Sequence, residues 1–156
     1  MKKVVSVLLS VMIMFTLSVP SLAVDNTDNA NTVIEYLEDG SCIETTIVVK
    51  EYISTYATQV KKVEKSISYK DEDGLVCWKA TLTATFRYTG SSATCTDSDV
   101  TYTINDSAWK ITSATASKSG NTATADITAK RYTLGIPFKT VDRTITMTCS
   151  ANGTIS

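Results

Sequence analysis

Apolar and polar residues alternate with a period of two over most of the chain, and the alternation is clearest at residues 76–88. Trp78, Leu82 and Phe86 fall on one face of this segment, whereas the other face carries a lysine, an arginine and three threonines. Such alternation is typical of a β-strand that buries one face. The same pattern recurs at residues 43–49, 63–69, 100–104, 123–129 and 141–149.

Glycine and short polar residues lie between these segments, at residues 70–74, 89–92 and 119–121. Residues of this kind allow the backbone torsions of tight turns, so short antiparallel connections are expected. The pattern therefore predicts an all-β protein, a single antiparallel β-sandwich of about seven or eight strands.

Helical spacing of apolar residues is absent from long segments beyond the N-terminal region, so only a minor helix is expected, near residues 31–37. The expected domain organisation has three parts. Residues 1–23 form a signal peptide, residues 24–32 a flexible Asn/Asp-rich lead-in, and residues 33–156 one sandwich domain.

The N-terminal segment has the pattern of a signal peptide: Lys2 and Lys3, an apolar run, and small residues that end at Ala23. A membrane anchor is the competing interpretation. The apolar run is shorter than the roughly 18 to 20 residues of a spanning helix, and a polar segment follows it. We therefore expect cleavage before Val24, a secreted, extracellular protein, and no stable membrane insertion after cleavage.

Charge and composition exclude several classes of function. Without the leader the chain carries 13 basic and 16 acidic residues, a net charge of −3, and has no basic face suited to nucleic acid. The chain contains no histidine, which removes the usual general base and excludes Ser-His-Asp triads and zinc sites that contain histidine. No cofactor, no metal and no catalytic residue is assigned.

The four cysteines of an exported chain predict disulfide bonds. Cys149 shares the inward parity of its strand, whereas Cys77 and Cys42 fall on outward positions. If bridges join like faces, Cys95 pairs with Cys149 in the core and Cys42 pairs with Cys77 at the surface. Free thiols or another pairing remain the alternatives.

Two groups of acidic residues have both a functional and a structural interpretation. Residues 71–74, Asp-Glu-Asp-Gly, contain a fragment of a calcium loop but lack its alternating ligands and distal glutamate, so a hairpin turn is expected. Asp97, Asp99 and Asp106 could converge for acid–base work or cation binding, but they also suit turn capping.

The candidate contact patch comprises Trp109, Tyr132, Leu134, Ile136 and Phe138. Trp109 begins a strand and could offer a half-exposed ring to a sugar, with burial in the core as the alternative. The other four residues surround a Gly-x-Pro corner, and proline is confined to sheet edges or bends. Their segment either folds back onto the core or forms an exposed contact surface.

The second half of the chain resembles a group of uncharacterised small secreted Thr/Ser-rich β proteins of Gram-positive (Firmicute-type) bacteria. The segments that carry the resemblance are WKATLTATFRYTGSSATCT, SAWKITSATASKSGNTATADITAKR and TVDRTITMTCSANGTIS. The resemblance implies secretion, a Gram-positive origin and a β-rich domain, and it supplies no active site.

These observations favour a secreted, non-enzymatic binding or interaction module that acts at the cell envelope. Its expected partner is a protein or an envelope polysaccharide. The alternative is a small extracellular hydrolase or hydrolase inhibitor, but the chain lacks histidine and any recognisable nucleophile motif.

Overall fold

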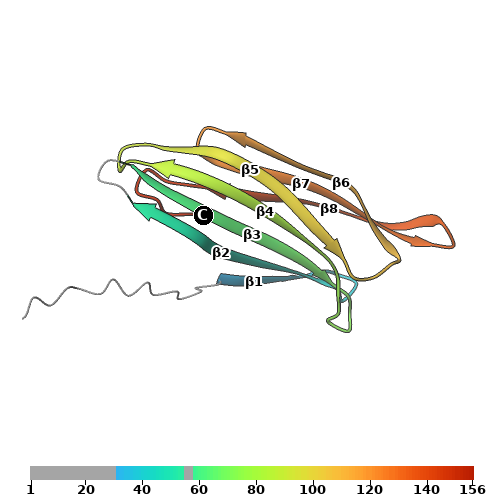
Figure 1. The fold of residues 1–156 in the computed structure, drawn as a ribbon. Helices are drawn as coiled ribbons and strands as arrows, with labels where there is room; N and C mark the ends of the chain where they lie inside the picture. Colours follow the sequence, from blue (N-terminus) through green and yellow to red (C-terminus); the bar gives the residue numbers. More distant parts are fainter. Residues whose placement is uncertain (1–30, 55–57) are drawn as a thin grey trace, which may run out of the picture.

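The computed structural model describes residues 31–54 and 58–156, which form eight antiparallel strands in two sheets (Figure 1). The first sheet has the order β1-β2-β3-β4-β5, and the second has the order β6-β7-β8. The strands are β1 (Asn31–Tyr36), β2 (Cys42–Ser54), β3 (Gln59–Lys70), β4 (Val76–Tyr88), β5 (Ala93–Ile104), β6 (Trp109–Ser119), β7 (Thr122–Thr133) and β8 (Ile136–Thr148). The expected signal peptide lies outside the described residues.

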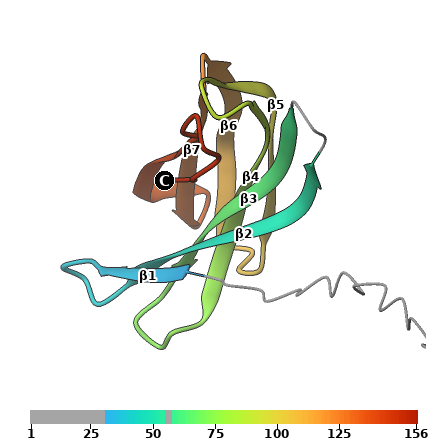
Figure 2. The ribbon, with the colours of Figure 1, turned by 90° about the vertical axis from the view of Figure 1, so that its left-hand side faces the viewer.

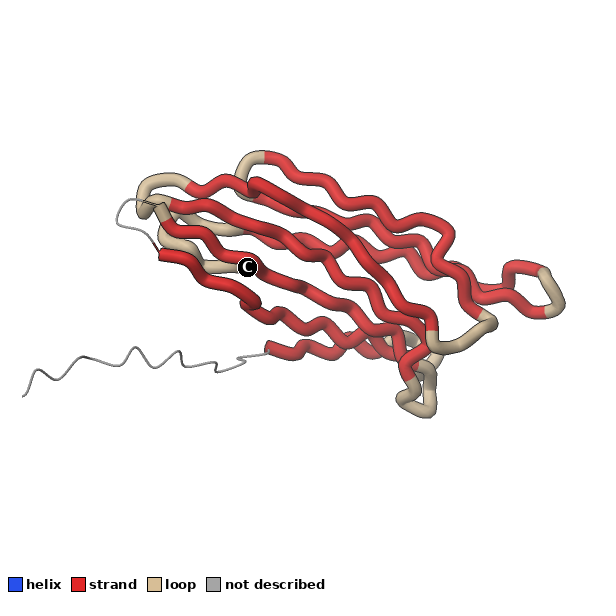
Figure 3. Tube along the Cα trace, viewed as in Figure 1, coloured by secondary structure: helices blue, strands red, loops and turns tan. Residues whose placement is uncertain are grey.

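The structure confirms the all-β sandwich. Each alternating segment lies in a strand, and the three predicted turns connect β3 to β4, β4 to β5, and β6 to β7 (Figure 3). The described residues contain no helix, and hence none that could cross a membrane.

The helix predicted near residues 31–37 is wrong, because this segment is β1. Six consecutive residues of β1 pair with β2 without a register shift. These ladder hydrogen bonds, together with the β-branched Val33 and Ile34, favour a strand over a short isolated helix. The sheet also begins at Asn31, so the final two residues of the predicted lead-in belong to β1.

The core lies where β6, β7 and β8 pack on β3, β4 and β5. Strand β4 contributes every second side chain to this core, from Trp78 to Tyr88, as its alternation predicts. The largest fully buried side chains are Trp78, Trp109, Phe86, Leu82, Ile127, Ile145 and Met147. Burial of such apolar side chains is the main favourable contribution to folding.

Strands β1 and β2 extend the larger sheet to one side of the smaller sheet (Figure 2). Two ion pairs connect this extension to β8: Arg143 with Glu35, and Lys139 with Asp39. At the other end, the chain after β8 returns along it, and Cys149 forms a bridge with Ile155. The uneven sheets leave one projecting hairpin and one hollow, at opposite ends of the sandwich.

Candidate functional site

The β7–β8 hairpin projects past the ends of the neighbouring strands (Figures 1 and 3). Thr133 pairs with Ile136 at its tip, so Leu134 and Gly135 form a two-residue turn. Their φ angles are 52° and 81°. Positive φ at both central positions is the geometry of a type I′ turn, which matches the twist of the two strands.

Apolar side chains at this tip are exposed to solvent. Leu134 is 98% exposed, Ile136 68% and Phe138 67%, whereas Tyr132 is half-buried. The segment therefore does not fold back onto the core. Four of the five residues of the candidate contact patch lie together on one projecting element.

Two cations lie over aromatic rings of the hairpin. Lys110 Nζ is 5.0 Å from the centroid of the Tyr132 ring, and the Arg131 guanidinium carbon is 6.0 Å from the centroid of the Phe138 ring. The quadrupole of an aromatic ring attracts a cation placed over its face. These contacts place positive charge directly behind the apolar tip.

On the inner side of the hairpin, Lys139 forms two polar contacts within the protein. Its ammonium group donates hydrogen bonds to a carboxylate oxygen of Asp39 and, at 2.6 Å, to the Tyr69 hydroxyl. The hydrogen bond from Lys139 is the main reason that the pKa of Asp39 falls to about 2. Lys139 therefore attaches the base of the hairpin to the loop between β1 and β2.

Trp109 does not belong to the exposed patch, because it is only 2% exposed. Its ring packs against Tyr69, with 4.8 Å between ring centroids, and against Trp78 at 6.3 Å. The suggestion that Trp109 offers a surface to a sugar is therefore wrong. Trp109 opens β6 on the face that meets the larger sheet, so its strand position directs it into the core.

All four cysteines are buried free thiols, so neither predicted disulfide is present in the structure. The prediction that Cys77 faces outward from its strand is wrong. A register shift between β3 and β4 leaves Cys77 outside the regular pairing, and its side chain joins the core cluster. Cys42 lies outside that cluster.

Cys95 and Cys149 are brought together by the β6–β7 turn. The Cys95 amide donates to Gly120 O at 2.8 Å, and the Cys149 amide donates to Asn121 O at 3.0 Å. Burial raises the pKa of the Cys149 thiol, and a smaller increase comes from Cys95. Cys95 and Cys149 are therefore both buried beside this turn, which agrees with the prediction that they lie on the same face.

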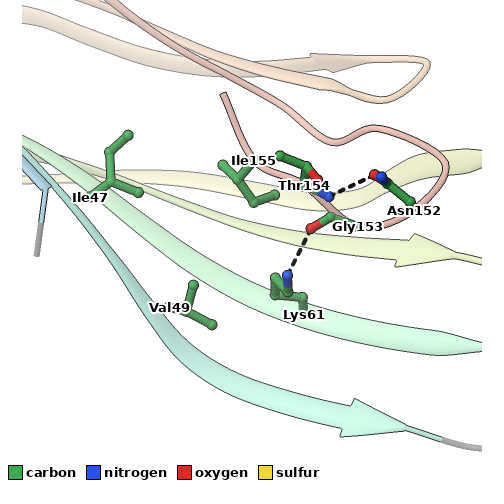
Figure 4. A pocket seen from close by; sticks show the side chains of 7 residues that line it. All are labelled: Ile47, Val49, Lys61, Asn152, Gly153, Thr154 and Ile155. Carbon is green, nitrogen blue, oxygen red and sulfur yellow. Dashed lines mark hydrogen bonds between the residues drawn. The ribbon is translucent and has the colours of Figure 1, made fainter. Parts of the chain in front are cut away.

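A hollow of about 380 Å³ lies at the opposite end of the sandwich (Figure 4). Its lining residues are Ile47, Val49, Lys61, Asn152, Gly153, Thr154 and Ile155. Lys61 Nζ donates a hydrogen bond of 2.7 Å to Gly153 O across it. Burial raises the pKa of the adjacent Tyr88 hydroxyl to about 12. This hydroxyl is protonated at neutral pH and does not serve there as a base.

Lys61 and Lys65 are partly buried on β3, although lysine side chains on a strand usually lie in solvent. Lys65 Nζ donates to Thr146 O at 2.8 Å, so both ammonium groups satisfy backbone carbonyls at the edge of the sandwich. Partial burial lowers the pKa of Lys65. The sequence could have indicated this partial burial, because both lysines share the parity of the buried Val63 and Ile67.

The acidic residues do not form a common site. Asp97 and Asp99 are exposed on β5, whereas Asp106 accepts a hydrogen bond from the Ala108 amide in a turn. In the loop at residues 71–74, the Asp71 carboxylate accepts hydrogen bonds from the Asp73 and Leu75 amides, which is typical of a hairpin turn. The described residues contain no group of three acidic or cysteine side chains able to hold a metal ion.

No protein-family model, no curated protein and no solved structure matches this chain. Of the hairpin and the hollow, the hairpin is the stronger site, because its apolar side chains are exposed to solvent, whereas the lysine in the hollow is hydrogen-bonded.

Proposed function

We propose that this protein is a secreted, non-enzymatic binding module that engages a component of the cell envelope through the tip of its β7–β8 hairpin. The observation that carries the proposal is Leu134. It is 98% exposed and has a φ of 52°. Left-handed backbone costs a residue with a Cβ about 1–2 kcal/mol, and an exposed side chain recovers none of this by burial. Binding of a partner accounts for leucine at this position.

The neighbours of Leu134 support the same conclusion. Ile136 and Phe138 are exposed beside it on a projecting hairpin. Single exposed apolar residues are normal on a protein surface, but a group of them often marks a site of interaction. The tight turn and the two paired strands also hold these side chains in place before binding, which lowers the entropic cost of association.

The chemistry of the chain supports a binding role over catalysis. The sequence contains no histidine, and the carboxylates considered as candidate acid–base groups lie apart on β5 and in a turn. The N-terminal pattern of basic, apolar and small residues supports secretion. A secreted binding module meets the cell envelope first, so we place its partner there.

The test is Leu134→Asn. Asparagine tolerates left-handed backbone, and Asn-Gly is the favoured dipeptide of a type I′ turn. We expect this variant to melt at the same temperature or higher, yet to lose at least about tenfold of the capture by isolated cell envelopes, since about 1.4 kcal/mol corresponds to tenfold. The measurements are thermal unfolding and cosedimentation with envelopes.

The matched control is Ile53→Asn. Ile53 is 56% exposed near the end of β2, at the other end of the sandwich from the hairpin. Its substitution should leave capture unchanged. Equal capture by the wild type and by Leu134→Asn would show that the hairpin is not the contact.

A second variant, Phe138→Ser, separates a contact role from a role in the core. Because Phe138 is 67% exposed, we expect its loss to destabilise the fold by less than about 1 kcal/mol and to weaken capture. A buried ring would cost roughly 3 to 5 kcal/mol. A loss of that size in thermal unfolding would contradict the proposal.

A further inference from the structure

We propose that the β7–β8 hairpin binds the surface of an anionic lipid bilayer, with its apolar tip among the lipid headgroups and the lysine pair Lys110 and Lys130 on the phosphates. This inference rests on the proposed function and names the partner of the same site. The contact is shallow and reversible, and differs from a membrane span.

The lysine pair is the first observation. Lys110 on β6 lies directly opposite Lys130 on β7 in the register of the smaller sheet. Like charges in directly opposed positions destabilise a sheet. Within the described part of the chain, neither lysine forms an ion pair. Two unpaired ammonium groups side by side form a site suited to an anion.

The lysine pair and the apolar tip belong to one continuous surface. Lys110 Nζ lies 5.0 Å from the centroid of the Tyr132 ring, which places the pair beside the hairpin that ends in Leu134. The ten residues from Lys130 to Lys139 include three cations and no acidic residue. Apolar, aromatic and basic groups therefore follow one another from the tip toward the body of the protein.

The spacing of these groups matches the layers of a membrane surface. Leu134 follows Lys130 by four residues, which corresponds to about 13 Å along a strand. An interfacial apolar element enters about 5–10 Å into the boundary between headgroups and acyl chains. Tyr132 then lies at headgroup depth, where amphipathic aromatic rings are enriched. The lysine pair reaches the phosphates.

The orientation follows from the charges that are already paired. Lys139, on the inner side of the hairpin, binds Asp39 and the Tyr69 hydroxyl. Lys110 and Lys130 lie on the outer face without an ion pair among the described residues, whereas Arg131 lies on the inner side with its guanidinium over the Phe138 ring. We infer that the part of the outer face beside Lys110 and Lys130 is inclined toward the membrane. Asp126 and Asp142, farther along β7 and β8 on the same face, and the loop carrying Asp39 are then inclined away from it.

A bilayer fits the hairpin better than a polysaccharide or a protein does. The tip projects from the sandwich, and Trp109, the candidate for sugar stacking, is buried. A protein partner would need an apolar pocket with an anionic rim at a matching depth. An anionic membrane presents these two layers over its whole surface.

The test is sedimentation of the purified protein with lipid vesicles. We expect binding to vesicles that contain phosphatidylglycerol, little binding to vesicles of phosphatidylcholine alone, and weaker binding as salt is raised. Lys110→Ala combined with Lys130→Ala should lower the partition coefficient by about tenfold or more, because each basic residue adds to the attraction near an anionic surface. Leu134→Asn should lower it further.

Two controls have matched chemistry. Lys79→Ala removes an exposed lysine from the outer face of β4, and Ile53→Asn removes an exposed apolar residue near the end of β2. Both should bind vesicles as the wild type does. A loss per removed charge as large for Lys79→Ala as for the Lys110 and Lys130 substitutions would reduce the effect to net charge and would overturn the proposed site.

Ile136→Trp provides a second measurement at the tip. Its indole emission should shift to the blue on addition of anionic vesicles and should be quenched by brominated acyl chains, whereas Ile53→Trp should show neither effect. An unchanged tip emission in the presence of bound vesicles would overturn insertion of the hairpin.

The outcomes separate this inference from the proposed function. If the wild type does not bind vesicles but Leu134→Asn still abolishes capture by envelopes, the lipid assignment is wrong and the partner is a protein or a polysaccharide. If Leu134→Asn changes neither assay, both the lipid assignment and the role of the hairpin are wrong.

Discussion

Gly153 lies so close to the ring of Tyr88 that a side chain there has no room. A Cβ added at Gly153 would be 2.3 Å from two ring carbons of Tyr88, and its φ is 85°. The hydrogen bond from Lys61 to the Gly153 carbonyl holds the turn in this position. This contact fixes the C-terminal turn against the larger sheet.

We predict that Gly153→Ala destabilises the protein by about 2 to 4 kcal/mol, the sum of overpacking and left-handed backbone. Gly90→Ala is the matched control, because Gly90 has a φ of 87° and no atom within 4 Å of an added Cβ. Gly90→Ala should lower the free energy of unfolding only by the backbone contribution, about 1 to 2 kcal/mol. Equal losses in denaturant unfolding would show that Tyr88 moves aside.

Single residues differ in how well the sequence predicts them. The burial of Trp78 follows from its parity with Leu82 and Phe86. Lys61 and Lys65 share the parity of buried neighbours, but their charge by itself would place them in solvent. The exposure of Leu134 could not be predicted, because it depends on how far the hairpin extends past the rest of the sandwich.

At the scale of elements, strands with two different faces were predictable. Strand β4 has the predicted bounds, Val76–Tyr88, because alternation ends where the turn residues begin. Strand β1 was not predicted, because it is short and its stability comes from pairing with β2, a non-local interaction. The register shift beside Cys77 was also beyond a parity argument, because a bulge changes the face of the residues at it.

The positions of the four cysteines lead to a prediction about cross-linking. Both Cys95 and Cys149 are anchored to the β6–β7 turn, whereas Cys77 lies in the core cluster and Cys42 outside it. For protein recovered from an oxidising medium, we expect non-reducing peptide mapping to join Cys95 to Cys149 and to leave the other two unpaired. The bridge should stabilise the fold by roughly 2 to 4 kcal/mol.

Two outcomes would contradict this prediction. A bridge between Cys42 and Cys77 would require movement of the β3–β4 bulge, and a bridge between Cys42 and Cys149 would contradict the described strand arrangement. Replacement of both Cys95 and Cys149 by alanine should lower the midpoint of denaturant unfolding under oxidising conditions more than under reducing conditions.

At the scale of the whole molecule, the N-terminal pattern predicts export. The secreted protein should begin at Val24, because Ser21 and Ala23 provide the small residues that signal peptidase requires. Intact mass of the protein from the culture medium checks this. Ala23→Arg should block cleavage, and recovery of the wild type only with Met1 retained and bound to membranes would contradict the prediction.

The sequence by itself determined the fold class, because a period of two, turn residues between segments and the lack of long helical spacing leave few other ways to bury the apolar faces. It also singled out the residues around Pro137 as unusual. Only the tertiary structure decided that Trp109 is buried while Leu134, Ile136 and Phe138 are exposed. Periodicity reports which face of a strand is apolar, whereas exposure depends on which strands lie opposite and where they end, and these distances are set by contacts between residues far apart in the chain.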